Sequence, residues 1–221
     1  ELRVLREDAM ARVLERYYRS GSQPFLALAD SFSAGRDDRR MAEAVERIYD
    51  FIRSHPFPER WLREKAAMYH TALPFSQTIW GKVLLQYARQ VLSYGEALCR
   101  NSLEAMAQEE DIQKAWGESY ASDLAEVQRA LEAAESGEWD RLAERLQGFQ
   151  WIRSKQLRGR SGDPIKERIA SARKLLKQTV EGLQRIFCTQ EDECSWELEQ
   201  TAPLADMLFE VTAAFGQELE E

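Results

Sequence analysis

The stretch that decides the fold is EAVERIYDFIRSHPFPERWL, residues 43–62. In its first half the apolar side chains recur at three- and four-residue spacing, at Val45, Ile48, Tyr49 and Ile52. This spacing predicts an amphipathic helix. The prolines at 56 and 58 break that helix, and Pro58 suits the first position of a second one, because a proline there loses no helical hydrogen bond. The stretch therefore predicts two helices joined by a short turn.

The rest of the chain has the composition of a helical protein. It is rich in Ala, Glu, Leu, Arg and Gln and has few runs of β-branched residues. At 221 residues with 44% hydrophobic side chains, it is long enough to bury a core of ordinary size. We expect an all-α fold, an elongated multi-helix bundle that forms a single helical domain over residues 1–221.

The apolar spacing predicts further helices on both sides of the deciding stretch. They cover residues 2–19, 24–32, 58–71, 119–135, 138–149 and 164–187. Gly35 supplies a turn, and Asp37 or Asp38 is a possible N-cap for the helix that contains Val45. Asp163 followed by Pro164 is a strong helix start.

Two of the predicted helices have unusual features. From Ile79 two apolar stripes run in parallel, which predicts a central helix touched from two sides and extending to Trp116. In the last helix Pro203 must either begin a new segment or bend a continuous one, and we expect the bend.

Neither a membrane span nor a targeting segment is evident. No apolar run approaches the roughly 18 residues that cross a bilayer, and residues 1–10 lack the pattern of a signal peptide. We expect a soluble, cytoplasmic protein, and the start without a methionine suggests a piece of a longer polypeptide. The odd number of cysteines, Cys99, Cys188 and Cys194, favours buried or half-buried free thiols over disulfides or a zinc site.

The sequence contains no catalytic, cofactor-binding or metal-binding motif. Gly81 and Lys82 lie inside a predicted helix and lack the glycine that would precede them in a phosphate-binding loop. His55 and His70 are the only histidines, and for both we favour a structural role. Core packing is likewise the favoured role of Trp61, Trp80, Trp116 and Trp139.

The formal charge is −8, but the positive charge is concentrated in one segment. Residues 153–177 hold nine lysines and arginines against two acids, whereas residues 190–221 hold ten acids and no base. The first of these cations lie on a non-helical segment, residues 151–163, called the basic loop. Its Gly159 and Gly162 leave it free to adapt to a phosphate backbone. The candidate DNA contacts are Arg153, Lys155, Arg158, Arg160, Lys166, Arg173, Lys174 and Lys177.

Two further observations bear on this basic segment. Trp151 lies beside the cations and could pack on a sugar or base, and the helix that begins at Pro164 adds a partial positive charge at its start. The plain alternative is that the cations only pair with the acidic helices, as on many solvated surfaces. Phosphate contacts would instead make binding strongly dependent on salt and largely independent of base sequence.

Residues 47–62, RIYDFIRSHPFPERWL, carry a resemblance to a known family. They resemble the AddA-type subunit of the bacterial ATP-dependent helicase/nuclease, a relative of the UvrD-like superfamily 1 helicases. Residues 2–18 and 172–215 are similar to the same family, so the resemblance covers about half of the chain.

The resemblance implies the inserted arm subdomain called 1B. In this family two RecA-like motor domains use ATP and Mg and move along DNA, and an exonuclease domain lies at the far C-terminus. No cofactor is expected in this chain itself. An insertion must leave and rejoin its host at neighbouring points, so we expect the first and last helices to lie side by side with both chain ends together.

Two functional hypotheses follow. The resemblance implies an arm that positions double-stranded or forked DNA near the unwinding junction during double-strand break repair by homologous recombination. The alternative is a helical docking module that contacts the partner B subunit of the helicase/nuclease, with the basic segment as half of an electrostatic interface and without direct DNA contact. An independent enzyme is disfavoured, because no set of polar residues converges as a catalytic site would require.

Overall fold

The computed structural model describes residues 2–32, 37–158 and 160–220, and within these ranges the only regular elements are helices. The predicted all-α class is confirmed. The chain divides into two compact units. Unit 1 comprises Glu1–Ala72 and Trp196–Glu221, and unit 2 comprises Leu73–Ser195. The expectation that residues 1–221 form one domain stays a prediction.

Unit 1 is built from four helices and most of a fifth. They are α1 (Leu2–Ser20), α2 (Gln23–Phe32), α3 (Arg39–Ile52), α4 (Pro58–Ala67) and α9 (Glu191–Glu220). Phe25, Val45 and Phe215 are fully buried and belong to one apolar cluster, so α2, α3 and α9 share a core. α9 is continuous through Pro203, as expected.

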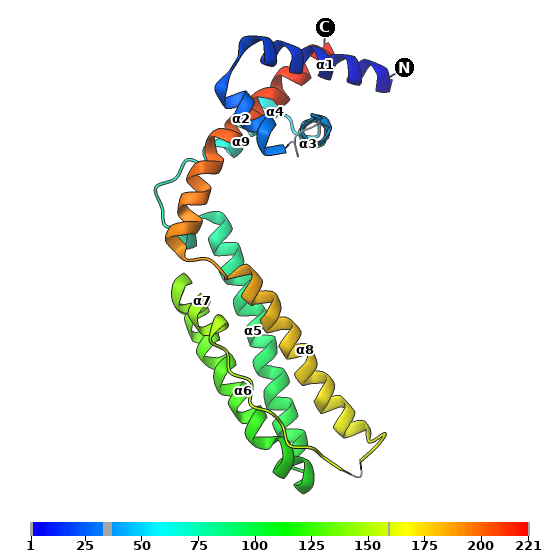
Figure 1. Ribbon diagram of the computed structural model, residues 1–221, viewed down its shortest axis with the longest axis vertical. Coiled ribbons are helices and arrows are strands. Elements are labelled where there is room, and N and C mark those ends of the chain that lie inside the picture. Colours follow the sequence, from blue (N-terminus) through cyan, green and yellow to red (C-terminus); the bar gives the residue numbers. More distant parts are fainter. Residues whose placement is uncertain (1, 33–36, 159, 221) are drawn as a thin grey trace. The chain divides into compact units, whose positions relative to one another are not determined.

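The first and last helices lie side by side within unit 1 (Figure 1). Arg12 donates from Nε to the Glu218 carboxylate at 2.7 Å, and the Tyr17 hydroxyl donates to Glu210 at 2.9 Å. Leu5, near the start of α1, and Leu219, near the end of α9, line one hollow. The expectation that the first and last helices lie side by side is confirmed, and Leu5 and Leu219 bring the start of α1 to the end of α9, whereas residues 1 and 221 lie outside the described ranges.

The deciding stretch forms α3, a turn and α4, as predicted. Pro58 occupies the first position of α4, and Ile52 and Leu62 are buried on the two helices. α4 ends at Ala67, four residues before the expected end. Asp38 holds the N-cap position of α3 but its side chain makes no capping bond. The turn expected at Gly35 lies outside the described residues.

Unit 2 is a bundle of long helices with one short helix at its side. Its elements are a 3₁₀ turn (η1, Phe75–Gln77), α5 (Ile79–Met106), α6 (Glu110–Ser136), α7 (Trp139–Gln147), α8 (Pro164–Ile186) and the first turn of α9. α5, α6 and α8 run alongside one another (Figure 1). Gly95 permits this close packing, because a Cβ there would stand 2.8 Å from the Leu176 side chain.

The prediction that the central helix extends to Trp116 is wrong. The chain reverses at residues 107–109, and Trp116 lies on α6. On one straight helix, Met106 would face away from Ile112, because six residues turn a helix through about 240°, and Trp116 would lie about 15 Å further along the axis than Met106. The reversal brings all three side chains into a single cluster with Ile169 of α8.

The expectation that α5 is touched from two sides is confirmed, because both α6 and α8 contact it, but one of its two apolar stripes is not covered by the described residues. Leu85, Ala88 and Leu92 face the core that α6 and α8 complete. The second apolar stripe stays open to solvent, with Ile79, Val83, Tyr87 and Tyr94 between 48% and 58% exposed. Within the described residues, α6 and α8 cover adjacent sides of α5 and leave this stripe uncovered.

The remaining predictions concern helix ends and cysteines. Gly137 ends α6 with φ 76°, and Asp163 caps α8 by accepting from the Ile165 amide at 2.9 Å, both at the expected positions. Cys99 is buried and Cys194 half-buried, but Cys188 is exposed because it follows the last turn of α8. Among the described helices, none is long and apolar enough to cross a membrane.

Candidate nucleic-acid interface

The basic loop is held against α6 in an extended conformation. The Lys155 amide donates to the Ala115 carbonyl at 3.2 Å, and the Trp116 indole donates back to the Lys155 carbonyl at 3.0 Å. One residue earlier, the Ser154 hydroxyl lies 2.8 Å from the Ser119 hydroxyl. These bonds fix the middle of a segment that was expected to be adaptable. Gly159, one of the two glycines behind that expectation, lies outside the described residues.

Arg173 is the side chain that ties the basic loop to the helices. Its guanidinium donates to both carboxylate oxygens of Asp123, at 2.6 and 3.1 Å, and to the Ile152 carbonyl at 2.7 Å. It also donates to Ser154 and lies over the Tyr120 ring at 5.4 Å. The side chain of Arg173 is 10% exposed and that of Asp123 is 0% exposed. Arg173 is therefore a buried structural cation.

The protonation of this pair follows from burial. Desolvation raises the pKa of the Asp123 carboxyl, and the Arg173 guanidinium opposes that shift. Because the carboxylate has no exposure of its own, water cannot compensate its charge, and the adjacent guanidinium takes that role. The two residues stabilise unit 2 as a pair.

Arg160 closes the far end of the basic loop. Its guanidinium contacts Glu109 at 2.6 Å, Asp111 at 2.7 Å and Asp163 at 2.8 Å. The loop is thereby joined to the α5–α6 connection and to the start of α8. The hydrogen bonds that the Arg160 guanidinium donates to these carboxylates, Glu109 foremost, raise its pKa. Three carboxylates already neutralise the charge of this predicted DNA contact.

The other six predicted contacts make no ion pair with the described residues. Lys177 lies over the Trp151 ring at 5.2 Å, and Lys166 donates to the Arg160 carbonyl at 3.2 Å. The side chains that face solvent are Arg153, Lys155, Arg158 and Lys174. Trp151, expected to offer a face to a sugar or base, is half-buried between Phe149 and the cations of Arg173 and Lys177.

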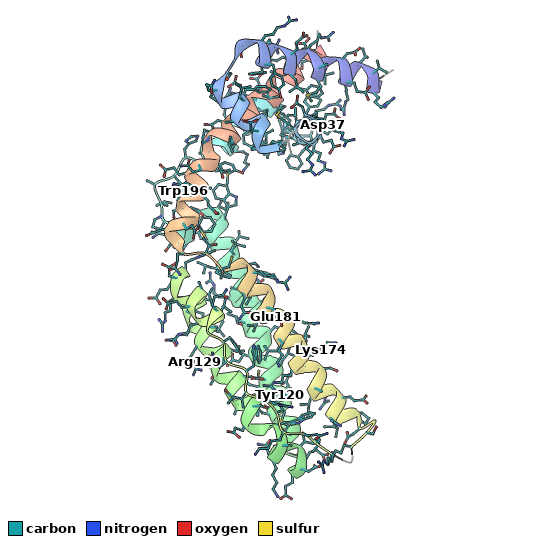
Figure 2. All side chains as sticks on the ribbon, in the orientation of Figure 1. Asp37, Tyr120, Arg129, Lys174, Glu181 and Trp196 are labelled. Atoms are coloured by element: carbon teal, nitrogen blue, oxygen red, sulfur yellow. The ribbon has the colours of Figure 1, made fainter. Side chains whose placement is uncertain are left out.

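Three of the lysines surround one hollow in the surface of unit 2. Lys155, Lys174 and Lys177 line a space of about 400 Å³, and its lining contains no carboxylate. Trp116 and Tyr120 form part of the floor and stack with ring planes 15° apart. Figure 2 labels Tyr120 among the helices and Lys174 on α8. The arrangement suits phosphate groups, which can meet several ammonium groups at once.

Asp123 is the residue of the candidate site that the sequence analysis did not identify. It lies on a predicted acidic helix, where a single carboxylate is typical of a solvated face. A weak indication existed, because Asp123 shares a helical face with Tyr120 and Val127, three and four residues away. The charge pattern alone could not show that Asp123 would be buried against Arg173.

Comparison with known proteins links the chain to one kind of subunit. It is 30% identical over 174 residues to the A subunit of the ATP-dependent helicase/nuclease from Acetivibrio thermocellus, which covers 76% of this chain and 14% of that protein. It is 29% identical over 199 residues to the protein of the same name from Lachnoclostridium phytofermentans, covering 87% and 14%. The match to the one from Alkaliphilus oremlandii, at 27% identity, covers 100% of this chain and 18% of that protein.

The similarity therefore includes the basic loop and the residues around it. The chain spans about one sixth of the length of these curated relatives. No family model matches it.

Proposed function

This chain belongs to the family of ATP-dependent helicase/nuclease A subunits, and from that premise we propose that it is the helical arm that positions DNA. In this proposal the arm holds double-stranded or forked DNA near the unwinding junction during double-strand break repair by homologous recombination. The arm is positional and performs no chemistry. ATP and Mg act in motor parts of a longer protein, and the B subunit is its partner in the cytoplasm.

One observation carries this proposal. Lys155, Lys174 and Lys177 converge on a hollow without a carboxylate in its lining, although the chain as a whole carries a charge of −8. A cluster of unpaired cations on an acidic protein repels itself unless an anion lies against it, and duplex DNA presents phosphates at close spacing. The buried Arg173–Asp123 pair holds the loop residue Lys155 next to the helix residues Lys174 and Lys177.

The alternative function, a protein docking module, is favoured by a different observation. The exposed stripe of α5, formed by Ile79, Val83, Tyr87 and Tyr94, is an apolar helix face such as a partner helix could cover. Contact with the B subunit through this stripe requires none of the basic residues. The two functions can therefore be tested by separate substitutions.

The test is a fluorescence anisotropy titration of the chain with labelled forked and blunt duplex DNA. The test variant replaces Lys155, Lys174 and Lys177 with Gln. Its control replaces Lys82, Lys114 and Arg129 with Gln, which lowers the net charge by the same amount on other exposed parts of unit 2. Arg160 and Arg173 are left unchanged, because their loss would disturb the fold.

We expect the test variant to bind both DNAs at least tenfold more weakly than the parent and the control to remain within about threefold. If DNA binding were weakened equally in both variants, the effect would come from the net charge alone. That result would contradict a localised interface. Loss of binding to the B subunit in Val83→Asp, with unchanged DNA affinity, would favour the docking function.

A further inference from the structure

The turn between α3 and α4 carries aromatic rings that the core of unit 1 does not use. Phe51 is 57% exposed and Phe57 is 69% exposed, whereas most large apolar side chains of this unit are covered. His55 and Trp61 are half-buried, and each lies 5.4 Å from the Phe51 ring, centroid to centroid. We call Phe51, His55, Phe57 and Trp61 the aromatic turn. Phe51, His55 and Trp61 form one cluster of rings, and Phe57 is the most exposed ring of the same turn, so the turn offers aromatic surface for a contact.

The rings are held in place by the local fold. The Ser54 amide donates to the Phe51 carbonyl and the His55 amide donates to the Ile52 carbonyl at 2.8 Å, which closes the end of α3. His55 and Trp61 lie 5.3 Å apart, and the Lys65 ammonium lies 5.7 Å from the centroid of the Trp61 ring. This support fixes the direction of the Phe51 ring without burying it. A preformed aromatic surface loses little side-chain entropy when a flat partner stacks on it.

Arginines lie next to one ring of the aromatic turn, Phe57. Arg53, Arg60 and Arg63 line a hollow of about 640 Å³ together with Phe57, and the lining also contains Glu59 and Glu220. Arg60 pairs with Glu64 at 2.7 Å, and Arg63 lies 3.9 Å from Glu59. All four of these side chains are more than half exposed, so the two pairs are weak and open to exchange with another anion. Arg53 lies over the Tyr49 ring at 5.8 Å.

Rings and exchangeable arginines together match one class of ligand. Single-stranded nucleic acid offers flat bases that stack on aromatic side chains and a phosphate backbone that pairs with cations. A duplex cannot use the rings, because its base faces are stacked inside the helix. We propose that the aromatic turn binds a single strand, with an unpaired base on Phe57 and the phosphates beside Arg53 and Arg63, which line the same hollow.

This site is separate from the basic loop, which belongs to unit 2, and the proposal does not depend on the function inferred for that loop. The proposal gives a role to exposed residues within 47–62, the stretch that carries the family resemblance. The duplex contact proposed for unit 2 does not involve these residues.

The experiment titrates the chain with 5′-fluorescein-labelled oligo(dT) of twenty nucleotides. We expect Phe57→Ala to weaken binding roughly tenfold, because stacking on one ring accounts for about that much affinity per base. Phe57→Tyr should restore it, because the ring face returns. The matched control is Trp196→Ala, which removes an aromatic side chain that is 59% exposed elsewhere in unit 1. This control should bind like the parent.

A second measurement separates rings from charges. Arg63→Gln should lower the slope of log affinity against log salt by about 0.7, the value for one phosphate contact on a single strand, whereas Phe57→Ala should leave the slope unchanged. Equal affinity of the parent and Phe57→Ala overturns the proposal. So does a parent chain that does not bind oligo(dT), in which case the aromatic turn is a protein contact. Circular dichroism checks that each variant is folded.

Discussion

Arg173 and Lys174 are neighbours in the chain, yet the structure gives them opposite surroundings. Arg173 points into unit 2 and meets the buried Asp123, and Lys174 is exposed beside a hollow that contains no carboxylate. The basic segment thus has an inner side, Arg160 and Arg173, and an outer side, Lys155, Lys174 and Lys177. The inner cations hold the basic loop to the helices. The bonds of the inner cations also keep the outer cations in position, and the outer cations remain available to an anion.

The comparison predicts the largest stability loss at the centre of the inner side. Arg173→Ala leaves Asp123 buried without its cation, and removal of one partner of a buried pair costs about 3–5 kcal/mol. The free energy of unfolding, measured by urea denaturation, should fall by that amount. The double variant Arg173→Met with Asp123→Leu should recover most of it, because no buried charge is left unpaired. A loss below about 1 kcal/mol in the single variant would contradict an inner role.

A smaller loss is expected where the inner side meets the loop. Ser154→Ala removes the hydroxyl that accepts from Arg173 and contacts Ser119. The net cost of such hydrogen bonds is about 1 kcal/mol each, so the free energy of unfolding should fall by about 1–2 kcal/mol. Ser171→Ala, which removes an exposed serine of α8, is the control and should change little. Equal losses in the two variants would show that Ser154 does not anchor the loop.

The N-cap of α5 allows the stability of unit 2 to be tested at a position outside the basic segment. The Thr78 hydroxyl caps α5 by accepting from the Gly81 amide at 3.1 Å. Thr78→Ala should lower the free energy of unfolding by about 1 kcal/mol, the usual cost of a lost N-cap. Thr78→Ser, which keeps the hydroxyl, should lose much less. DNA affinity should be unchanged in both variants, and a change there would mean that stability and binding are not separable.

The smallest stability effect belongs to the outer side. Lys174→Gln removes an exposed charge and should change the free energy of unfolding by less than about 0.5 kcal/mol. Its DNA affinity should nevertheless fall, because a phosphate contact is lost. Urea denaturation and anisotropy titration of the same preparation measure both. If Lys174→Gln unfolded more easily but bound DNA normally, Lys174 would have the structural role assigned to the inner cations. That result would contradict the division into inner and outer sides.

Much of the fold could be predicted from spacing alone. The apolar repeats that give α1, α3 and α8 are local, and so are the Pro58 and Pro164 starts. The reversal at residues 107–109 could not be predicted, because no glycine or proline marks it. It depends on Met106 and Ile112 reaching the same cluster, which is a tertiary contact.

For the candidate interface, the sequence predicted the segment but not the surroundings of each cation. The local excess of lysine and arginine identified the segment that holds the candidate contacts, but it could not distinguish the eight cations from one another. The division into inner and outer sides depends on Asp123, fifty residues before Arg173, and on Glu109 and Asp111 beside Arg160. Long-range pairs of this kind leave no periodic pattern in the sequence. The exposed stripe of α5 has the same origin, because spacing cannot show how many helices surround a bundle member.

The central claim is that the outer cations meet duplex phosphates, and the salt dependence of binding tests it most directly. Log affinity for forked DNA is measured against log salt for the parent and for the variant with Lys155, Lys174 and Lys177 replaced by Gln. With about 0.9 per duplex phosphate contact, the slope should become shallower by roughly 3 in the variant. Superimposable affinities and slopes for the two proteins would contradict the account.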